Sequence, residues 1–328
     1  MAMSNYSGGF GDGVIIRGLP LTISHPGKVF WVGNYAGLTT AATGYLTGQK
    51  TASNGNDGSF NAPFSTLDYA IGRCSAQRGD IIFVKPGHQE TYSAADGFEL
   101  DVAGVAVIGL GQGSLRPKFI LDTADTADVN VSAANCTLYN LVFEAGFADI
   151  VRAIQVTAAN VSIISCAFVD QAADENFLTP IKATSTSDNN ADGLWVEACT
   201  WMSPDIGGLE FIETNADVRY GYVADNFIVH EGTDSPLILA ATGKDWKMAR
   251  VYRNRKSTKD TAGAIFLDID TTGTNNSGIV MDNLNRHADV TGAHGMMAAD
   301  NGFGLFGNLS TSVNNLSGFV LPAIDVDL

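Results

Sequence analysis

Short apolar strands separated by polar turns recur along the chain at intervals of 25 to 33 residues. Three clear copies are Val105–Leu110, Cys136–Phe143 and Val161–Phe168, and further copies occupy 194–201, 220–227, 246–253, 279–283 and 303–309. The copies differ in the length of their turns and agree in their strands, which is typical of a solenoid whose coils stack strand upon strand. The pattern therefore predicts one elongated all-β body.

One polar position is shared by the last four copies. It is occupied by Asn226, Asn254, Asn283 and Asn308, each three residues after a branched apolar residue. Asparagine tolerates the left-handed backbone of a sharp turn, and stacked amides can hydrogen-bond from coil to coil. We therefore expect an asparagine ladder at one bend of the solenoid. The alternative is that asparagine is simply common in turns.

The segment before the first strand carries the start signals of a helix. Ser65 can cap it, and Asp68 stands three residues later as a capping-box partner. Leu67, Ala70, Ile71 and Cys74 then fall on one face. We predict a helix near residues 65–77 that covers the open end of the solenoid, where strand edges and core would otherwise be exposed.

Residues 1–55 are rich in Gly, Thr and Ala and contain two apolar islands. Exposed Ile, Phe and Trp are unusual on a monomer, so these islands favour a binding role. We predict an amino-terminal arm over 1–55 that attaches to other subunits, followed by a single domain over 56–328. The expected contact residues are Ile15, Ile16, Arg17, Phe30 and Trp31.

Several segments carry a resemblance to a known family. Asn56–Phe60, Pro63–Leu67 and Gly79–Gly87 resemble the amino-terminal cap of right-handed parallel β-helix proteins of the pectate-lyase-like superfamily, and the similarity extends over roughly residues 55 to 310. The whole chain, from the arm to Gly318–Ala323, resembles β-helix virion proteins of tailed bacteriophages. The resemblance implies a right-handed parallel β-helix on the outer surface of a virion, assembled in the host cytoplasm.

The charge balance argues against some partners. The chain has 19 Lys and Arg against 35 Asp and Glu, a net charge of −16. Phosphate neutralisation needs a concentrated positive surface, so we expect no nucleic-acid partner. No stretch approaches the ~20 apolar residues of a membrane span, and the first residues lack the pattern of a signal peptide, so we expect neither a membrane partner nor export by that route.

Basic residues gather in one segment, 244–259, which holds Lys244, Lys247, Arg250, Arg253, Arg255, Lys256 and Lys259. Such a run is typical of a solvated face, and the alternative is a docking patch for an acidic partner.

The four cysteines form no Cys-x-x-Cys pair. Cys166 and Cys199 occupy matched places in consecutive copies, so we expect small buried side chains there, with a disulfide as the weaker alternative.

Candidate catalytic residues are few. The superfamily includes polysaccharide lyases, which use calcium-binding carboxylates and an arginine, and hydrolases, which use aspartates on adjacent coils. Asp268 and Asp270 alternate along a strand and would share one face, and two carboxylates ~5–9 Å apart can hydrolyse glycosides. Asp205, Glu210 and Glu213 form a second acidic group. Exposed strand aspartates are more often a plain polar face, and the five His show no metal-type spacing, so we expect no metal or cofactor.

We expect a structural role and no enzymatic activity, and we keep two alternatives. The structural role is that of a virion protein, a capsid decoration or cement protein that binds the major capsid protein or other virion proteins as a homotrimer. The first alternative is a short tailspike-type glycan depolymerase that uses Asp268 and Asp270 or the second acidic group. The second alternative is a non-catalytic carbohydrate-binding spike, for which stacked aromatic side chains would be the expected sign.

Overall fold

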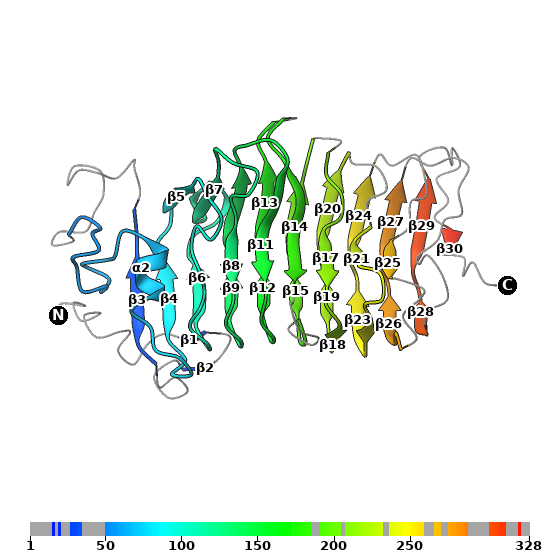
Figure 1. The fold of residues 1–328 in the computed structure, drawn as a ribbon, viewed down its shortest axis with the longest axis horizontal. Helices are drawn as coiled ribbons and strands as arrows, with labels where there is room; N and C mark the ends of the chain where they lie inside the picture. Colours follow the sequence, from blue (N-terminus) through cyan, green and yellow to red (C-terminus); the bar gives the residue numbers. More distant parts are fainter. Residues whose placement is uncertain are drawn as a thin grey trace.

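The computed structural model shows a parallel β-helix in which strands of successive coils stack into long sheets (Figure 1). It describes residues 15–16, 19–20, 27–34, 50–172, 174–184, 191–204, 207–231, 236–258, 266–269, 275–287, 302–312 and 321–322. The expectation of an all-β parallel solenoid is confirmed.

Three sheets form the walls of the described body. The first sheet contains β3 (Val29–Val32), β4 (Ile81–Val84), β6 (Ala106–Gly109), β9 (Thr137–Tyr139), β12 (Ser162–Ile164), β15 (Trp195–Glu197), β19 (Tyr222–Ala224), β23 (Ala249–Tyr252), β26 (Gly278–Met281) and β28 (Phe303–Phe306). The second sheet contains β5 (Gln89–Tyr92), β7 (Lys118–Leu121), β10 (Val142–Ala145), β13 (Ala167–Asp170), β16 (Thr200–Met202), β20 (Phe227–His230), β24 (Arg255–Thr258), β27 (Leu284–His287), β29 (Leu309–Ser312) and the antiparallel β30 (Leu321–Pro322). The third sheet contains β8 (Val129–Val131), β11 (Ile150–Val156), β14 (Phe177–Thr184), β17 (Ile212–Asn215), β21 (Ile238–Ala240) and β25 (Leu267–Ile269).

The remaining elements are short. β1 (Ile15–Ile16) pairs with β2 (Leu19–Pro20), and β18 (Val218–Arg219) pairs with β22 (Trp246–Lys247). The described helices are α2 (Leu67–Ile71) and the 3-10 turn η2 (Gly113–Leu115).

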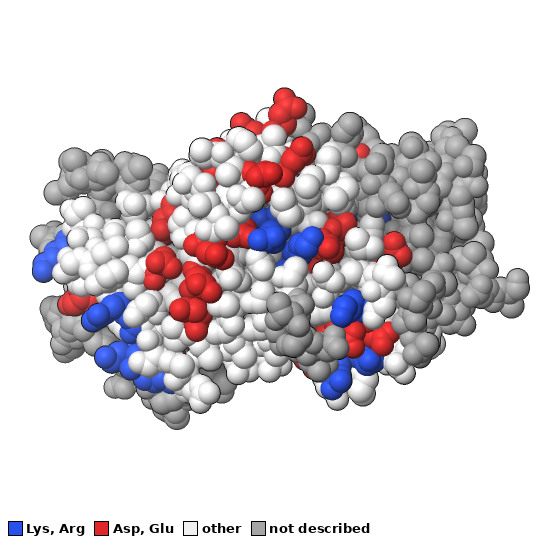
Figure 2. All heavy atoms as spheres, in the orientation of Figure 1, with Lys and Arg blue, Asp and Glu red and all other residues white. Residues whose placement is uncertain are grey.

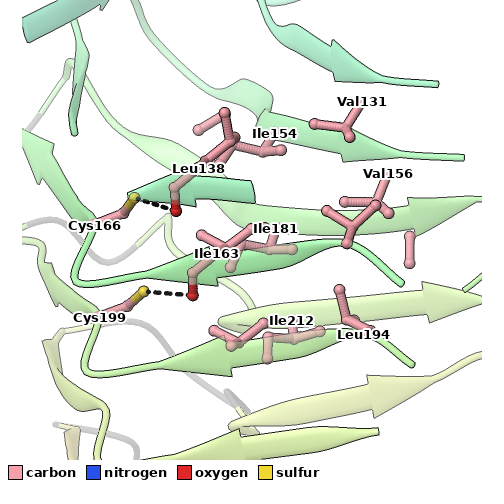
Figure 3. Close-up of a cluster of buried hydrophobic side chains, with 14 of the residues drawn as sticks. Val131, Leu138, Ile154, Val156, Ile163, Cys166, Ile181, Leu194, Cys199 and Ile212 are labelled. Carbon is pink, nitrogen blue, oxygen red and sulfur yellow. Dashed lines mark hydrogen bonds between the residues drawn. The ribbon is translucent and has the colours of Figure 1, made fainter. Parts of the chain in front are cut away.

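Apolar side chains fill the interior in columns that run along the stack. Phe119, Phe143 and Phe168 stack with ring centroids 5.9 and 5.6 Å apart. Leu138 and Ile163 face the branched residues of the third sheet, and the buried thiols of Cys166 and Cys199 lie beside them (Figure 3). All four cysteines are free, and the expectation of small buried side chains is confirmed for Cys166 and Cys199; Cys136 is also buried.

The asparagine ladder is confirmed. Asn226, Asn254, Asn283 and Asn308 are buried, and each side-chain amide nitrogen donates to a carbonyl oxygen of the preceding coil over 2.8–3.1 Å. The backbone reason differs from the expectation. The left-handed residues are the ones before the asparagines, namely Asp225, Arg253, Asp282 and Gly307, with φ between 52° and 62°. The asparagine side chains point inward and hydrogen-bond carbonyl oxygens of the preceding coil.

The predicted cap helix exists, but its beginning is different. α2 spans Leu67–Ile71, shorter than the predicted 65–77, and its N-cap is Thr66, which makes no side-chain cap bond, so Ser65 and Asp68 do not form the expected capping box. The free N–H groups are instead satisfied from outside: Asn54 Oδ1 accepts from Ser65 N, and Glu90 Oε1 accepts from Leu67 N at 2.7 Å. Leu67, Ala70 and Ile71 are buried in the main core, so α2 covers the first coils as expected.

The proposed arm begins inside the body. Val29–Val32 were assigned to the arm, but they form β3, which pairs in parallel with β4. Trp31 is 3% exposed and contacts Phe83 and Phe60, because an apolar run of four residues is stabilised more by joining the sheet than by facing water. The free edge of β3 is in turn paired by residues 58–64, since Trp31 N donates to Gly58 O and Gly33 N donates to Phe64 O.

Candidate functional site

Charged side chains of the described residues pair from one coil to the next. The inter-coil ion pairs are Lys118–Glu144, Asp128–Arg152, Lys182–Glu213, Asp217–Lys247 and Asp225–Arg253. Figure 2 shows basic side chains flanked by acidic ones near the middle of the visible face. These ion pairs join the same neighbouring coils that the strand hydrogen bonds join, so they add to the stability of the stack.

The second acidic group is brought together in part on the third sheet. Thr179 Oγ1 donates to Glu210 Oε1 at 2.6 Å, and Lys182 pairs with Glu213. Burial, with the nearby Glu213 carboxylate adding to it, raises the pKa of Glu210 to about 7. Glu210 is therefore a carboxylic acid that exchanges its proton near neutrality, next to a carboxylate held by a lysine. Asp205, the third member of the group, lies outside the described residues.

The aspartate pair on β25 is described in part. Asp268 is half-buried and lies in register with Leu239 of β21, whereas Asp270 lies outside the described residues. In register along the third sheet, Lys182, Glu213, Leu239 and Asp268 form one outward column. Catalysis by Asp268 and Asp270 stays an untested alternative. The described residues hold no group of three or more His, Cys, Asp and Glu side chains that could bind a metal ion.

A row of aromatic and apolar side chains covers the outside of the first sheet, and we call it the outer face. Its members on β15 to β28 and their preceding turns are Trp195, Tyr220, Tyr222, Met248, Tyr252, Ile279, Met281 and Phe306. The rings of Trp195 and Tyr222 lie 4.1 Å apart, and those of Tyr222 and Tyr252 lie 6.1 Å apart. Sequence reasoning did not find this surface. The signal in the sequence was an apolar residue directly before a core residue of the same strand, as in Trp195-Val196, Tyr222-Val223 and Ile279-Val280.

The expected attachment residues have different outcomes. Ile15 and Ile16 form β1, Arg17 lies outside the described residues, and Phe30 is half-buried against the core. Trp31 is buried in the body, so it is not an exposed contact. Attachment through Ile15, Ile16 and Arg17 stays a prediction.

The basic segment does not form a single exposed patch. Lys247 pairs with Asp217 and Asp245, and Arg253 forms a double hydrogen bond with Asp225. Lys256 points into the interior and is 2% exposed. Arg250 and Arg255 are exposed, and Lys259 lies outside the described residues. Neither a uniform solvated face nor a continuous docking patch for an acidic partner describes this arrangement.

No known family model matches the sequence, and no curated protein matches it. The chain is similar in structure to a rhamnogalacturonan lyase, with a TM-score of 0.45 and 11% identity over 80% of this chain and 74% of the lyase chain. The fold of this protein follows from its own strand pairing. In the part of the chain that the structure describes, no helix has the length and apolar character to cross a membrane.

Proposed function

We propose that this protein is a structural component of a bacteriophage virion, a capsid decoration or cement protein that attaches to the shell as an oligomer. The supporting observation is that its charged side chains form ion pairs between neighbouring coils. Asp128, Glu144 and Glu213 each pair with a cation of a neighbouring coil, and Asp128 and Glu144 are buried. Carboxylates tied up in this way hold a stack together and are poorly placed to reach a substrate.

The surface agrees with a role in assembly. A net charge of −16 keeps free copies apart in solution, so stable contacts require surfaces that overcome this repulsion. The exposed aromatic side chains of the outer face are such a surface, because extended apolar patches mark sites of protein association. The partners in this proposal are other copies of the chain and the major capsid protein.

The test is binding to capsids that were assembled without the protein. Purified chain is mixed with such capsids, bound copies are counted in electron micrographs, and the folded variant Leu115→Glu serves as a surface control. Tens to hundreds of ordered copies on the shell are expected. A few copies at the tail, or no binding, would contradict the decoration role.

A second candidate, a glycan depolymerase, is favoured by one observation. Glu210 has a pKa of about 7 and lies next to the lysine-paired Glu213, so the two groups resemble a proton donor and an ionised carboxylate. In this role Glu210 would protonate the leaving oxygen of a glycosidic bond, and Glu213 would stabilise the positive charge at the anomeric carbon or activate a water molecule.

This candidate is tested by incubating the purified protein with host polysaccharide, with and without calcium, and measuring reducing ends and unsaturated sugars. The structural proposal expects neither product. If products form, loss of activity in Glu210→Gln would assign the chemistry to the second acidic group. Loss in the double variant Asp268→Asn and Asp270→Asn would assign it to β25 and the residue after it.

A further inference from the structure

The outer face changes its environment along the stack. At the amino-terminal end, Trp31, Ile81 and Phe83 occupy the outer side of the first sheet and are nearly fully buried. The cover comes from the chain itself, because the ring of Phe60 packs edge-on against Trp31 at 4.8 Å and Lys85 lies over the Phe60 ring. An apolar outer side is therefore covered where the chain can reach it.

The later coils carry an equally apolar outer face that is exposed. Trp195 is 39% exposed, Tyr220 63%, Met248 59%, Ile279 41% and Phe306 58%. At 150–250 Å² for a full aromatic side chain, these five expose roughly 500 Å² of apolar surface. That equals the largest patches found on monomers and is more than half of the ~800 Å² that each partner contributes to a standard interface.

Two opposite charges lie within this face. Glu197 is on β15 and Arg250 is on β23, and β19 with Tyr222 runs between them. Trp195 Nε1 donates to Glu197 Oε2 at 2.9 Å, which fixes the carboxylate on the face. Arg250 is exposed and has no ion-pair partner among the described residues. A lone guanidinium among aromatic side chains needs an anion if that surface is to be covered.

We propose that the outer face binds a second copy of this chain. The two solenoid axes are antiparallel, and a twofold axis that runs along β19 relates the copies. The inference names the partner of the structural role proposed above and rests on it, but association can be measured without a virion. In a twofold contact each pair of facing positions occurs twice, so each Arg250 lies opposite Trp195 of the other copy, and the Glu197 carboxylate held by Trp195 Nε1 is the anion nearest to it. The Tyr222 rings meet at the axis.

The flanking strands fit the same axis. β12 and β26 are equally far from β19 in the first sheet, as are β9 and β28. Tyr139 on β9 then faces Phe306 of the second copy, and the largely buried Ile164 on β12 lies opposite Met281. Three copies with parallel axes, the homotrimer expected from the sequence, would instead bring three Arg250 side chains to one level, where like charges repel.

The experiment measures mass by light scattering and the dissociation constant by sedimentation. The parent should have twice the 34.5 kDa mass of one chain. Ile279→Glu and Phe306→Glu should each dissociate the pair. Leu115→Glu, a matched control at a side chain that is 52% exposed outside this face, should leave the mass unchanged.

A charge reversal tests the direction of packing. Arg250→Glu should weaken the pair about tenfold or more, because it brings two carboxylates close together at two places in the contact. Adding Glu197→Arg should restore most of the affinity, and circular dichroism should show that each variant is folded. A monomeric parent, a trimeric mass, or no rescue in the double variant would overturn the inference. A monomer that still decorates capsids would overturn this inference and leave the proposed function standing.

Discussion

Asn226 lies directly below Asn254 in the stack, and its Nδ2 donates to Asn254 Oδ1 over 2.8 Å. The same oxygen accepts the backbone N–H of Asn226 at 3.1 Å. Asn254 Nδ2 donates in turn to Val223 O and to Asn283 Oδ1. One side-chain amide therefore satisfies buried polar groups of the two neighbouring coils.

Replacing Asn254 by Ala should destabilise the protein by about 3 kcal/mol, because buried donors and acceptors lose their partners. Urea unfolding followed by circular dichroism measures the change. Asn215→Ala, at an exposed strand position, is the control and should stay within about 0.5 kcal/mol of the parent. Equal effects of the two variants would show that the ladder does not stabilise the fold.

Replacing Val161 or Ile163 by Asp should unfold the solenoid. Both side chains are fully buried, and an unpaired buried carboxylate costs several kcal/mol against a total stability of roughly 5–15 kcal/mol. Ser162→Asp is the matched control, since Ser162 lies between them and points outward. Thermal melting distinguishes the variants. A Val161→Asp or Ile163→Asp protein that melts within about 2 °C of the parent would contradict the register of β12.

Two deletions test where the body begins. Removing residues 1–26 keeps β3 and should leave β-sheet circular dichroism and cooperative melting intact. Removing residues 1–50 also deletes Trp31 and Val32, which are buried, and exposes the apolar outer side of β4. This deletion should lower the melting temperature by several degrees or more. Unchanged melting of the longer deletion would restore the boundary at residue 55.

Glu210 should make the stability depend on pH. Its pKa is about 7 in the folded state against 4.5 when exposed, so the folded state binds the proton more tightly. The resulting stability is fully present below about pH 4.5 and is lost as the pH rises through about 7. Glu210→Gln should remove this dependence and stabilise the protein at pH 8 by on the order of 2 kcal/mol. Urea unfolding of both proteins between pH 5 and 8 measures the difference, and parallel curves would contradict the assignment.

The sequence predicted those features that repeat. Strands such as β9 and β12, and the ladder from Asn226 to Asn308, recur at matched positions, and repetition exposes them in a single chain. The helix α2 was predicted from its apolar face. Its cap was wrong because the partners that satisfy its start, Asn54 and Glu90, are distant in sequence and become neighbours only after folding.

Features that occur once were harder to infer. β3 was assigned to an arm because the 48 residues between it and β4 hide their pairing, and a spacing of that length does not match the repeat. The pKa of Glu210 depends on burial by surrounding coils, which composition does not reveal. The outer face was missed because Trp195 and Val196 both count as apolar, although their side chains point to opposite sides of the strand.

The pairing of β3 with residues 58–64 has a consequence for growth. A parallel β-helix could polymerise head to tail, each molecule adding its last coil to the first coil of the next, and such a heterologous contact would produce an open filament. Filament growth needs both ends to be available. The chain itself occupies the edge of β3, where Phe64 N donates to Trp31 O at 2.9 Å. Because one end is blocked in this way, a second molecule cannot add its last coil there.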